Sequence, residues 1–386
     1  MKRYTVFLLS VLLVLGVVLS ACSSSTPTPA PQPEKTEASQ PEATEAPAEA
    51  TEAPAADIEP AKEIVFYNWS EYIEPEVYNL FEQETGIKVV EDNFSSNEEL
   101  LAKLQGGATG YALIVPSDYT VKIMIDEGLL APLDANNIPN LKNLAERFRN
   151  LYYDPGNKYC VPYQWGTTGI GYLSDQVEEP TSWAVFFDPD PNAPWYGRMT
   201  MLDDAREAFA AALVYLGYDI NTTDEKQLEE AKQALIRAKA ALSGYDSDTY
   251  EDLLASGENL MAHGWNGDFL MAMEDNENIA YTMPKEGGVI WIDNVCIPAS
   301  ATPEQKLAAE MFLNFILRPD VGAMISEYNW YATPNQAAEA ELDEEFLQDP
   351  SVYPPQDVLE KLQFIKPVGD AESLYQRMWD EVKAAP

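Results

Sequence analysis

The fold is decided by one stretch, Gly287-Gly288-Val289-Ile290-Trp291-Ile292-Asp293-Asn294-Val295. Paired glycines followed by large apolar side chains are typical of a strand that is entered through a turn. Side chains in a strand alternate between its faces, so Trp291 and Asp293 should share one face and the two isoleucines should lie on the other. A carboxylate beside a large aromatic ring is costly to remove from water unless a cation or a hydrogen-bond donor meets it. The stretch therefore indicates either a surface strand with a solvated Asp293 or a site that holds a cationic group.

The first 60 residues have the pattern of a secretory leader and a spacer. Residues 1–21 combine a basic start with an apolar run, which predicts a signal peptide. The run closes with Leu19-Ser20-Ala21-Cys22, which resembles the lipobox of bacterial lipoproteins and implies that Cys22 carries lipid; the alternative is an uncleaved membrane helix. Residues 22–60 are rich in Pro, Ala, Thr and Glu, so we expect a disordered tether after the lipidated cysteine.

Residues 61–386 are long enough for a sizeable core, and we expect two lobes. Of the formal net charge of −40, the leader contributes +2 and the spacer −7, which leaves −35 for these residues. Such an acidic surface argues against nucleic-acid binding and favours encounter with cations.

The composition excludes chemistry that needs several histidines or a cysteine cluster. There is one histidine, His263, and its neighbours Met261 and Trp265 favour a packed residue over a ligand or a catalytic base. With no cluster of metal-ligand spacing, we expect no metal site, no cofactor and no serine-protease chemistry. Cys160 and Cys296 could form a disulfide in an extracytoplasmic compartment or remain thiols, and their spacing leaves both open.

Strands and helices alternate along the first part of these residues. Strands are predicted at residues 63–67, 87–90 and 112–115, and helices at residues 75–86 and 96–105. Further on, helices are predicted at residues 223–242 and 302–317, and strands at residues 259–262 and 279–282. The alternation predicts an α/β chain with a mainly parallel sheet, in which ligands lie at loops beyond the carboxyl ends of strands.

Aromatic and acidic residues recur together at four loops or strand ends. The four segments are Tyr67-Asn68-Trp69-Ser70-Glu71-Tyr72, Pro116-Ser117-Asp118-Tyr119, Gly264-Trp265-Asn266-Gly267-Asp268 and the stretch quoted first. Tyr331 adds one more ring in a later turn. Each segment alone could be a turn or a helix cap, and Ser117 is an N-cap candidate. If they face one cleft, they form a slot with flat aromatic walls and negative ends.

A fifth segment, Leu202-Asp203-Asp204-Ala205-Arg206-Glu207, begins a helix. Asp204 and Glu207 have the spacing of a capping box, and acids in a first turn suit the helix dipole. A ligand cation at this position would oppose the dipole, so a cation site here would need two carboxylates. The segment has two, and capping and binding can therefore coexist.

The ligand that fits such a slot has methylene groups to lie against rings and ammonium groups to meet carboxylates. A linear polyamine has both features. Paired carboxylates and tryptophans also suit a secreted glycoside hydrolase, and an oligosaccharide or amino-acid receptor is a further alternative.

These residues resemble the spermidine/putrescine-binding proteins of bacterial polyamine ABC transporters, a two-lobe solute-binding family. The resemblance covers nearly all of residues 63–376. It is most specific at Tyr67-Asn68-Trp69-Ser70-Glu71-Tyr72, Val115-Pro116-Ser117, Asp203-Asp204-Ala205-Arg206-Glu207, Pro284-Lys285-Glu286-Gly287-Gly288 and Leu317-Arg318-Pro319-Asp320-Val321.

The resemblance implies a periplasmic-binding-protein fold of two α/β lobes with strand crossovers between them and a ligand cleft at the hinge. One lobe would contain residues 61–166 and 291–337, and the other residues 167–290 and 338–386. Trp291 would then lie where the chain crosses between the lobes.

The resemblance also implies the role of each site residue. The aromatic box around the methylene chain would consist of Trp69, Tyr72, Trp265 and Trp291. The carboxylates that meet the amines would be Asp204, Glu207 and Asp293, and the other contacts would be Ser70, Glu71, Ser117, Tyr119 and Tyr331. Asp268 matches an acid of putrescine-preferring relatives, and Gln363 is the nearest candidate for a glutamine that the family uses near its C-terminus. The choice between spermidine and putrescine stays open.

We therefore expect an extracytoplasmic lipoprotein, anchored to the cell membrane on its periplasmic side or outer face. We expect it to bind spermidine or putrescine as a monomer, without catalysis, and to deliver the ligand to an ABC transporter permease.

Overall fold

The computed structural model describes residues 58–386. The predicted signal peptide, the lipidation site Cys22 and nearly all of the predicted linker lie outside these residues. Within residues 58–386, no helix combines the length and the apolar composition that crossing a membrane requires.

A nine-stranded sheet runs through the described chain in the order β2-β1-β3-β9-β4-β7-β5-β6, with β8 paired to β4. Its strands are β1 (Glu63–Asn68), β2 (Lys88–Asn93), β3 (Tyr111–Ile114), β4 (Cys160–Leu173), β5 (Met199–Met201), β6 (Gly244–Tyr245), β7 (Met261–Trp265), β8 (Ile279–Thr282) and β9 (Val289–Cys296). Pairing is parallel in β2-β1-β3 and in β7-β5-β6, and antiparallel wherever β4 or β9 takes part. The prediction of a mainly parallel sheet is wrong for this middle part, because the strands that join the lobes run against their neighbours.

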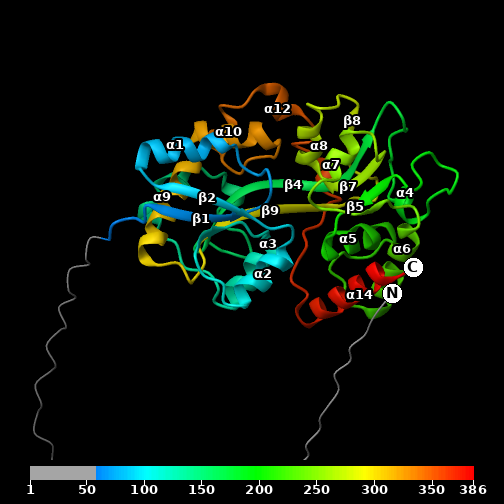
Figure 1. Cartoon of the computed structure of the whole chain (residues 1–386), viewed down its shortest axis with the longest axis horizontal. Coiled ribbons are helices and arrows are strands. Elements are labelled where there is room, and N and C mark those ends of the chain that lie inside the picture. The colour runs from blue at the N-terminus through cyan, green and yellow to red at the C-terminus, as the bar shows by residue number, and fades with distance from the viewer. Residues whose placement is uncertain (1–57) are drawn as a thin grey trace, which may run out of the picture. The chain divides into compact units, whose positions relative to one another are not determined.

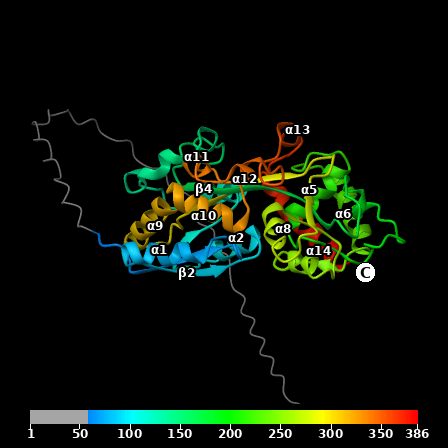
Figure 2. The same ribbon diagram turned by 90° about the horizontal axis from the view of Figure 1, so that it is seen from above.

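Helices cover the sheet as two lobes, which lie to the left and right in Figure 1 and remain separate in the turned view of Figure 2. Around β1–β3 lie α1 (Pro75–Thr85), α2 (Asn97–Gln105), α3 (Asp118–Asp126), α9 (Pro303–Ile316) and α10 (Pro319–Asn329). Around β5–β8 lie α4 (Ala184–Phe187), α5 (Ala205–Tyr215), α6 (Glu225–Lys239), α7 (Tyr250–Ala255), α8 (Asn266–Ala272) and α14 (Glu372–Ala384). The remaining short helices are η1 (Ala135–Asn137), η2 (Pro139–Asn143), η3 (Glu146–Phe148), α11 (Gln336–Glu339), α12 (Glu344–Gln348), α13 (Gln356–Leu359) and η4 (Gly369–Ala371).

The helix boundaries follow from local chemistry. In α1, Pro75 opens the first turn, and Gly86 ends the helix with a φ of 71°, which glycine adopts without steric cost. In α9, the Thr302 hydroxyl accepts the Gln305 N–H while the Gln305 side chain accepts the Thr302 N–H, which forms a complete capping box. These two helices begin where the sequence predicted.

Two antiparallel strands, β4 and β9, connect the lobes (Figure 1). The first part of β4 pairs with β9, and its later part pairs with β7 and β8 in the second lobe. Gly166 and Trp291, at which the predicted lobe boundaries fall, are partners in the β4–β9 register. Leu342 and Phe346, from the segment predicted to belong to the second lobe, share a buried cluster with Trp165.

Every residue of β4 is buried, and the sequence analysis did not predict this strand. Three glycines within it explain why. A Cβ at Gly166 would lie 2.6 Å from the ring of Trp291, at Gly169 2.5 Å from the hydroxyl of Tyr281, and at Gly171 2.2 Å from the ring of Phe269. Glycine lowers strand propensity, but here it lets aromatic rings pack directly on the backbone.

The predicted faces of β9 are confirmed. Trp291 belongs to the main hydrophobic core together with Val289 and Val295, whereas Ile290 and Ile292 contact a separate cluster. The open question of the cysteines is also answered, because Cys160 and Cys296 form a disulfide between paired positions of β4 and β9, with Cα atoms 4.4 Å apart.

Candidate ligand-binding site

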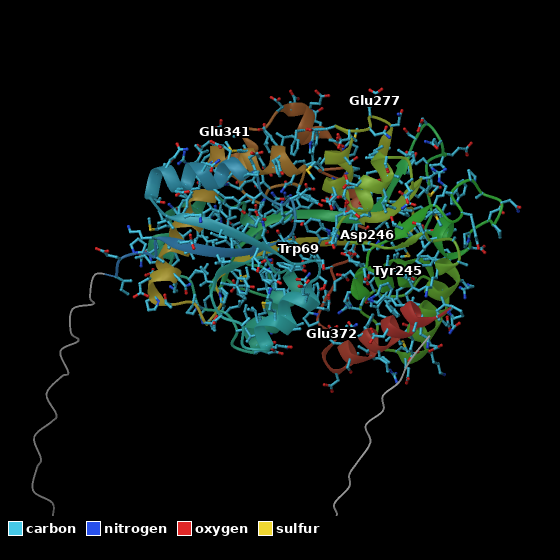
Figure 3. The ribbon with its side chains drawn as sticks, viewed as in Figure 1. Trp69, Tyr245, Asp246, Glu277, Glu341 and Glu372 are labelled. Atoms are coloured by element: carbon cyan, nitrogen blue, oxygen red, sulfur yellow. A yellow bond between two sulfur atoms is a disulfide. The ribbon has the colours of Figure 1, made fainter. Side chains whose placement is uncertain are left out.

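A cavity of about 850 Å³, part of it open to solvent, lies between the two lobes. Thirteen of the fourteen predicted ligand-binding residues line it. From the first lobe and β9 these are Trp69, Ser70, Glu71, Tyr72, Ser117, Tyr119, Trp291, Asp293 and Tyr331, and from the second lobe Asp204, Glu207, Trp265 and Asp268. Figure 3 shows Trp69 in the middle of the described chain, between the lobes. The segments that the sequence singled out therefore meet in one place.

Aromatic rings form the walls of the cavity. The Trp69 ring, held by a hydrogen bond from its Nε1 to the Val115 carbonyl (3.0 Å), meets the Trp265 ring edge-on with centroids 5.7 Å apart. On another wall, the Tyr331 ring lies 5.2 Å from the Trp291 ring and 5.3 Å from the Tyr72 ring. Because each ring is fixed by a neighbour, the faces that remain open are preorganised for methylene groups and cations.

Asp293 is buried and bridges two hydroxyl groups. Its Oδ1 accepts from the Ser117 hydroxyl (2.6 Å) and its Oδ2 from the Tyr72 hydroxyl (2.8 Å). Ser117 lies at the N-cap position of α3, but its side chain caps nothing, so the capping alternative for this residue is not adopted. Burial raises the pKa of Asp293 to about 7, although both hydroxyl bonds oppose the rise.

Asp204 caps α5 and Glu207 does not complete the box. The Asp204 Oδ1 accepts the N–H groups of Arg206 (2.9 Å) and Glu207 (3.0 Å). The Glu207 side chain instead enters the cavity, where Oε1 accepts from the Thr168 hydroxyl (3.1 Å) and the Trp265 indole (3.5 Å), and Oε2 has no hydrogen-bond partner in the described chain. Burial, and then the Asp204 charge, raise the pKa of Glu207 well above its usual value. Capping and an open carboxylate thus coexist.

Asp268 lies on the first turn of α8 and accepts two tyrosine hydroxyls, from Tyr250 to Oδ2 (2.6 Å) and from Tyr331 to Oδ1. Burial raises the pKa of Asp268 despite both bonds. Glu71, which also lines the cavity, has a φ of 51°, a left-handed conformation that few residues other than glycine adopt. Such backbone conformations cluster at ligand sites.

Gln363 is the one predicted ligand-binding residue outside the cavity, and the packed residue His263 also does not line it. The main chain of Gln363 pairs with the start of β9: its N–H donates to the Gly288 carbonyl (3.0 Å) and its carbonyl accepts the Ile290 N–H (3.1 Å). Ile365, two residues further, lines the cavity instead. His263 is buried against the Trp183 ring, which confirms that it is a packed residue.

Nine lining residues were not predicted from the sequence. They are Phe94, Ser95, Asn97, Asp118, Ser247, Asp248, Glu251, Met271 and Ile365. Asn97, whose Nδ2 donates to the Ser117 Oγ (2.9 Å), lies at the start of the helix predicted at residues 96–105, and Asp118 lies inside a quoted motif. Both could have been found from those signals. Glu251 follows no strand that the sequence predicted.

The lining carries strongly unbalanced charge. Eight of its residues are Asp or Glu, and among the described residues that line the cavity none is Lys or Arg. Buried carboxylates without a counter-charge are unfavourable, and their protonation relieves the cost. A ligand with several positive charges would relieve it as well.

The raised pKa of Asp293 predicts how the stability of the ligand-free protein changes with pH. Between 3.8, the ordinary pKa of Asp293, and about 7, its folded value, the folded chain binds a proton that the unfolded chain does not. Stability therefore rises as the pH falls from about 7 toward about 4. We expect the melting temperature to rise as the pH falls over this range. It should rise less in Asp293→Asn, which removes the Asp293 carboxyl while keeping the repulsion among the other acidic side chains. Equal pH slopes for parent and variant would contradict the assignment.

Residues 76–354 match the family described as bacterial extracellular solute-binding protein. The chain belongs to this family. This solute-binding protein is 38% identical over 324 residues to the spermidine/putrescine-binding periplasmic protein of Salmonella typhimurium, which covers 83% of this chain and 91% of the relative.

Solved structures show the same two-lobe α/β fold as this solute-binding protein. One from Listeria monocytogenes, assigned to a spermidine/putrescine ABC transporter, superposes with a TM-score of 0.79 at 35% identity and covers 84% of this chain and 100% of its own. The TpPotD lipoprotein of Treponema pallidum superposes with a TM-score of 0.71 at 32% identity and covers 83% and 99%. The predicted fold is therefore confirmed. Because these relatives bind solutes, the glycoside hydrolase alternative is not favoured, and the solute-binding protein is not an enzyme.

Proposed function

We propose that this protein binds a linear polyamine, spermidine or putrescine, in the cavity between its lobes. The observation that carries the proposal is the lining, which combines eight carboxylate side chains with aromatic walls and contains no Lys or Arg among the described residues. Neutral sugars can donate hydrogen bonds to those carboxylates but would leave their charge uncompensated. The relative from Salmonella typhimurium is named as a spermidine/putrescine-binding protein, and this name supports the same ligand class.

In this proposal the rings of Trp69, Tyr72, Trp265 and Trp291 surround the methylene chain, and the carboxylates of Asp204, Glu207, Asp268 and Asp293 meet the ammonium groups. A cation over an aromatic ring contributes about 0.5 to 2 kcal/mol, and charge-assisted hydrogen bonds are about twice as strong as neutral ones. Ser70, Glu71, Ser117 and Tyr119 complete the polar contacts. Gln363 would act only indirectly, by holding the start of β9.

The two lobes, residues 61–166 with 291–337 and residues 167–290 with 338–386, would close over the ligand about β4 and β9. Closure needs no chemical step, because a ligand that contacts both lobes shifts the population toward the closed state. The closed form would then deliver the polyamine to the membrane permease of an ABC transporter.

We also propose that the protein works outside the cytoplasm as a monomer anchored by lipid on Cys22. The apolar run that ends in Leu19-Ser20-Ala21-Cys22 and the similarity to a lipoprotein of Treponema pallidum support this anchoring. In cells, Cys22→Ser should move the protein from the membrane fraction to the soluble fraction. Retention of the variant in the membrane fraction would count against lipidation at this residue.

The ligand is tested by titration calorimetry with spermidine, putrescine, their acetylated forms and a neutral oligosaccharide. We expect one-to-one binding of at least one free polyamine and weaker binding once a terminal amine is acetylated, because acetylation removes a charge that a buried carboxylate meets. Heat with the oligosaccharide alone would overturn the proposal.

A further inference from the structure

The first turn of α7 contributes a carboxylate to the cavity that the resemblance did not single out. Glu251 follows Tyr250, whose hydroxyl donates to Asp268 and accepts the Trp265 N–H (3.0 Å). The α7 turn is therefore tied to two lining residues, and Glu251 is placed beside them at the cavity wall.

Glu251 is built into this wall without a partner. It is only 9% exposed, and its Oε2 has no hydrogen-bond partner in the described chain. No Lys or Arg of residues 58–386 forms an ion pair with it. The Ser247 Oγ, also in the lining, is likewise buried and unpaired. Buried polar groups normally have partners, so these unpaired groups in the cavity lining indicate a missing ligand group.

The charged and titratable groups around Glu251 are all acidic. Asp268 on α8, Asp252 beside it on α7 and Glu71 from the first lobe act on it, and burial together with Asp268 raises its pKa. An ammonium group bound here would lower that pKa again and release a proton. Without such a cation, this end of the cavity holds only repulsive neighbours.

This acidic end contains Asp268 and Glu71 beside Glu251, and Asp293 lies apart from it. Asp293 accepts a hydrogen bond from the Tyr72 hydroxyl, and Asp268 accepts one from the Tyr331 hydroxyl. The two tyrosine rings contact each other with centroids 5.3 Å apart and link the two acids. Asp204 and Glu207 form a further group at the start of α5. Seven of the eight lining carboxylates thus form three neighbouring groups: Glu251 with Asp268 and Glu71, Asp293 with Asp118, and Asp204 with Glu207, on which Asp293 also acts. A diamine has only two ammonium groups.

We infer that Glu251 is a specificity-determining residue that receives a third ammonium group, so that the site prefers a triamine to a diamine. This inference rests on the proposed function. A diamine fills two of the three acidic groups and leaves Glu251 protonated, whereas a triamine such as spermidine meets all three.

The test is calorimetry with spermidine and putrescine on the parent, Glu251→Gln and Asp252→Asn. Asp252 is exposed and follows Glu251 in the first turn of α7, so its variant removes one charge from the same helix without changing a lining residue. Glu251→Gln should weaken spermidine binding about ten-fold or more and putrescine binding about three-fold or less. Asp252→Asn should leave both affinities close to those of the parent.

A second readout separates recognition from a structural role. Spermidine binding measured in two buffers of different ionisation enthalpy gives the number of protons released. This number should fall in Glu251→Gln and change much less in Asp252→Asn, because Asp252 contributes less than burial and Asp268 to the raised pKa of Glu251. Glu251→Asp, which keeps the charge, should retain part of the preference for spermidine.

If Glu251→Gln lost affinity equally for both amines, or lost none for spermidine, the inference would be overturned, although polyamine binding by the parent would still stand. Failure of the parent to bind either amine would instead refute the proposed function. The two failures are therefore distinguishable in one experiment.

Discussion

The Asp293→Asn variant is expected to bind spermidine or putrescine at least about thirty-fold more weakly than the parent, because truncating one partner of a buried charge pair costs about 2 to 5 kcal/mol. Asparagine keeps the size of the side chain and can still exchange hydrogen bonds with Ser117 and Tyr72, whose hydroxyls lie 2.6 and 2.8 Å from the carboxylate oxygens. The fold should therefore persist. Calorimetry at about pH 8, where the parent carboxyl is ionised, measures the loss.

The pH dependence of binding provides an independent check of the same residue. With a pKa of about 7 in the ligand-free protein, Asp293 must lose its proton before it can meet an ammonium group. Affinity of the parent should fall as the pH is lowered from about 8 to about 6, whereas this part of the dependence should be missing in Asp293→Asn. The exposed residue Asp175 provides the matched control, and Asp175→Asn should behave like the parent. Parent-like affinity in Asp293→Asn would refute the role assigned to this carboxylate.

Replacing both Cys160 and Cys296 by alanine is expected to lower the free energy of unfolding by about 2 to 5 kcal/mol. The disulfide joins residues 136 apart in sequence, so its loss frees a long loop in the unfolded chain. Urea denaturation with and without a reducing agent measures the effect.

Reduction should shift the midpoint of the parent and leave the double variant unchanged. Ligand affinity should survive, because neither cysteine lines the cavity. Coinciding denaturation curves for parent and double variant would show that the bond contributes nothing to stability.

Much of the candidate site could be predicted because its signals are local. Trp69 directly follows β1, Trp265 is the last residue of β7, and each lies close in sequence to an acid, so a short segment already shows both the position and the chemistry. The strand β9 could be predicted in detail, down to the faces of Trp291 and Ile292, because alternation is set by strand geometry alone.

The features that could not be predicted from the sequence depend on contacts between distant segments or lie in segments too short to show a pattern. In β4, Gly166 and Gly171 look like breaks in a strand until the rings of Trp291 and Phe269 are in place. Glu251 lies on a helix of only six residues, too short to show a periodic pattern. Gln363 lies between short helices, where no regular element fixes the register, and a shift of two residues places Ile365 in the lining instead.

Three of the eight tryptophans, Trp69, Trp265 and Trp291, line the cavity. Indole fluorescence responds to nearby charge and to the loss of water, so we expect the emission spectrum of the unlabelled protein to change when a cation enters. Occupancy could then be followed optically in real time, including the rates of capture and release. With Trp69 and Trp265 on opposite lobes, removing either indole would show which side of the cleft reports first. The tryptophans that would contact the ligand thus also report its binding through their intrinsic fluorescence.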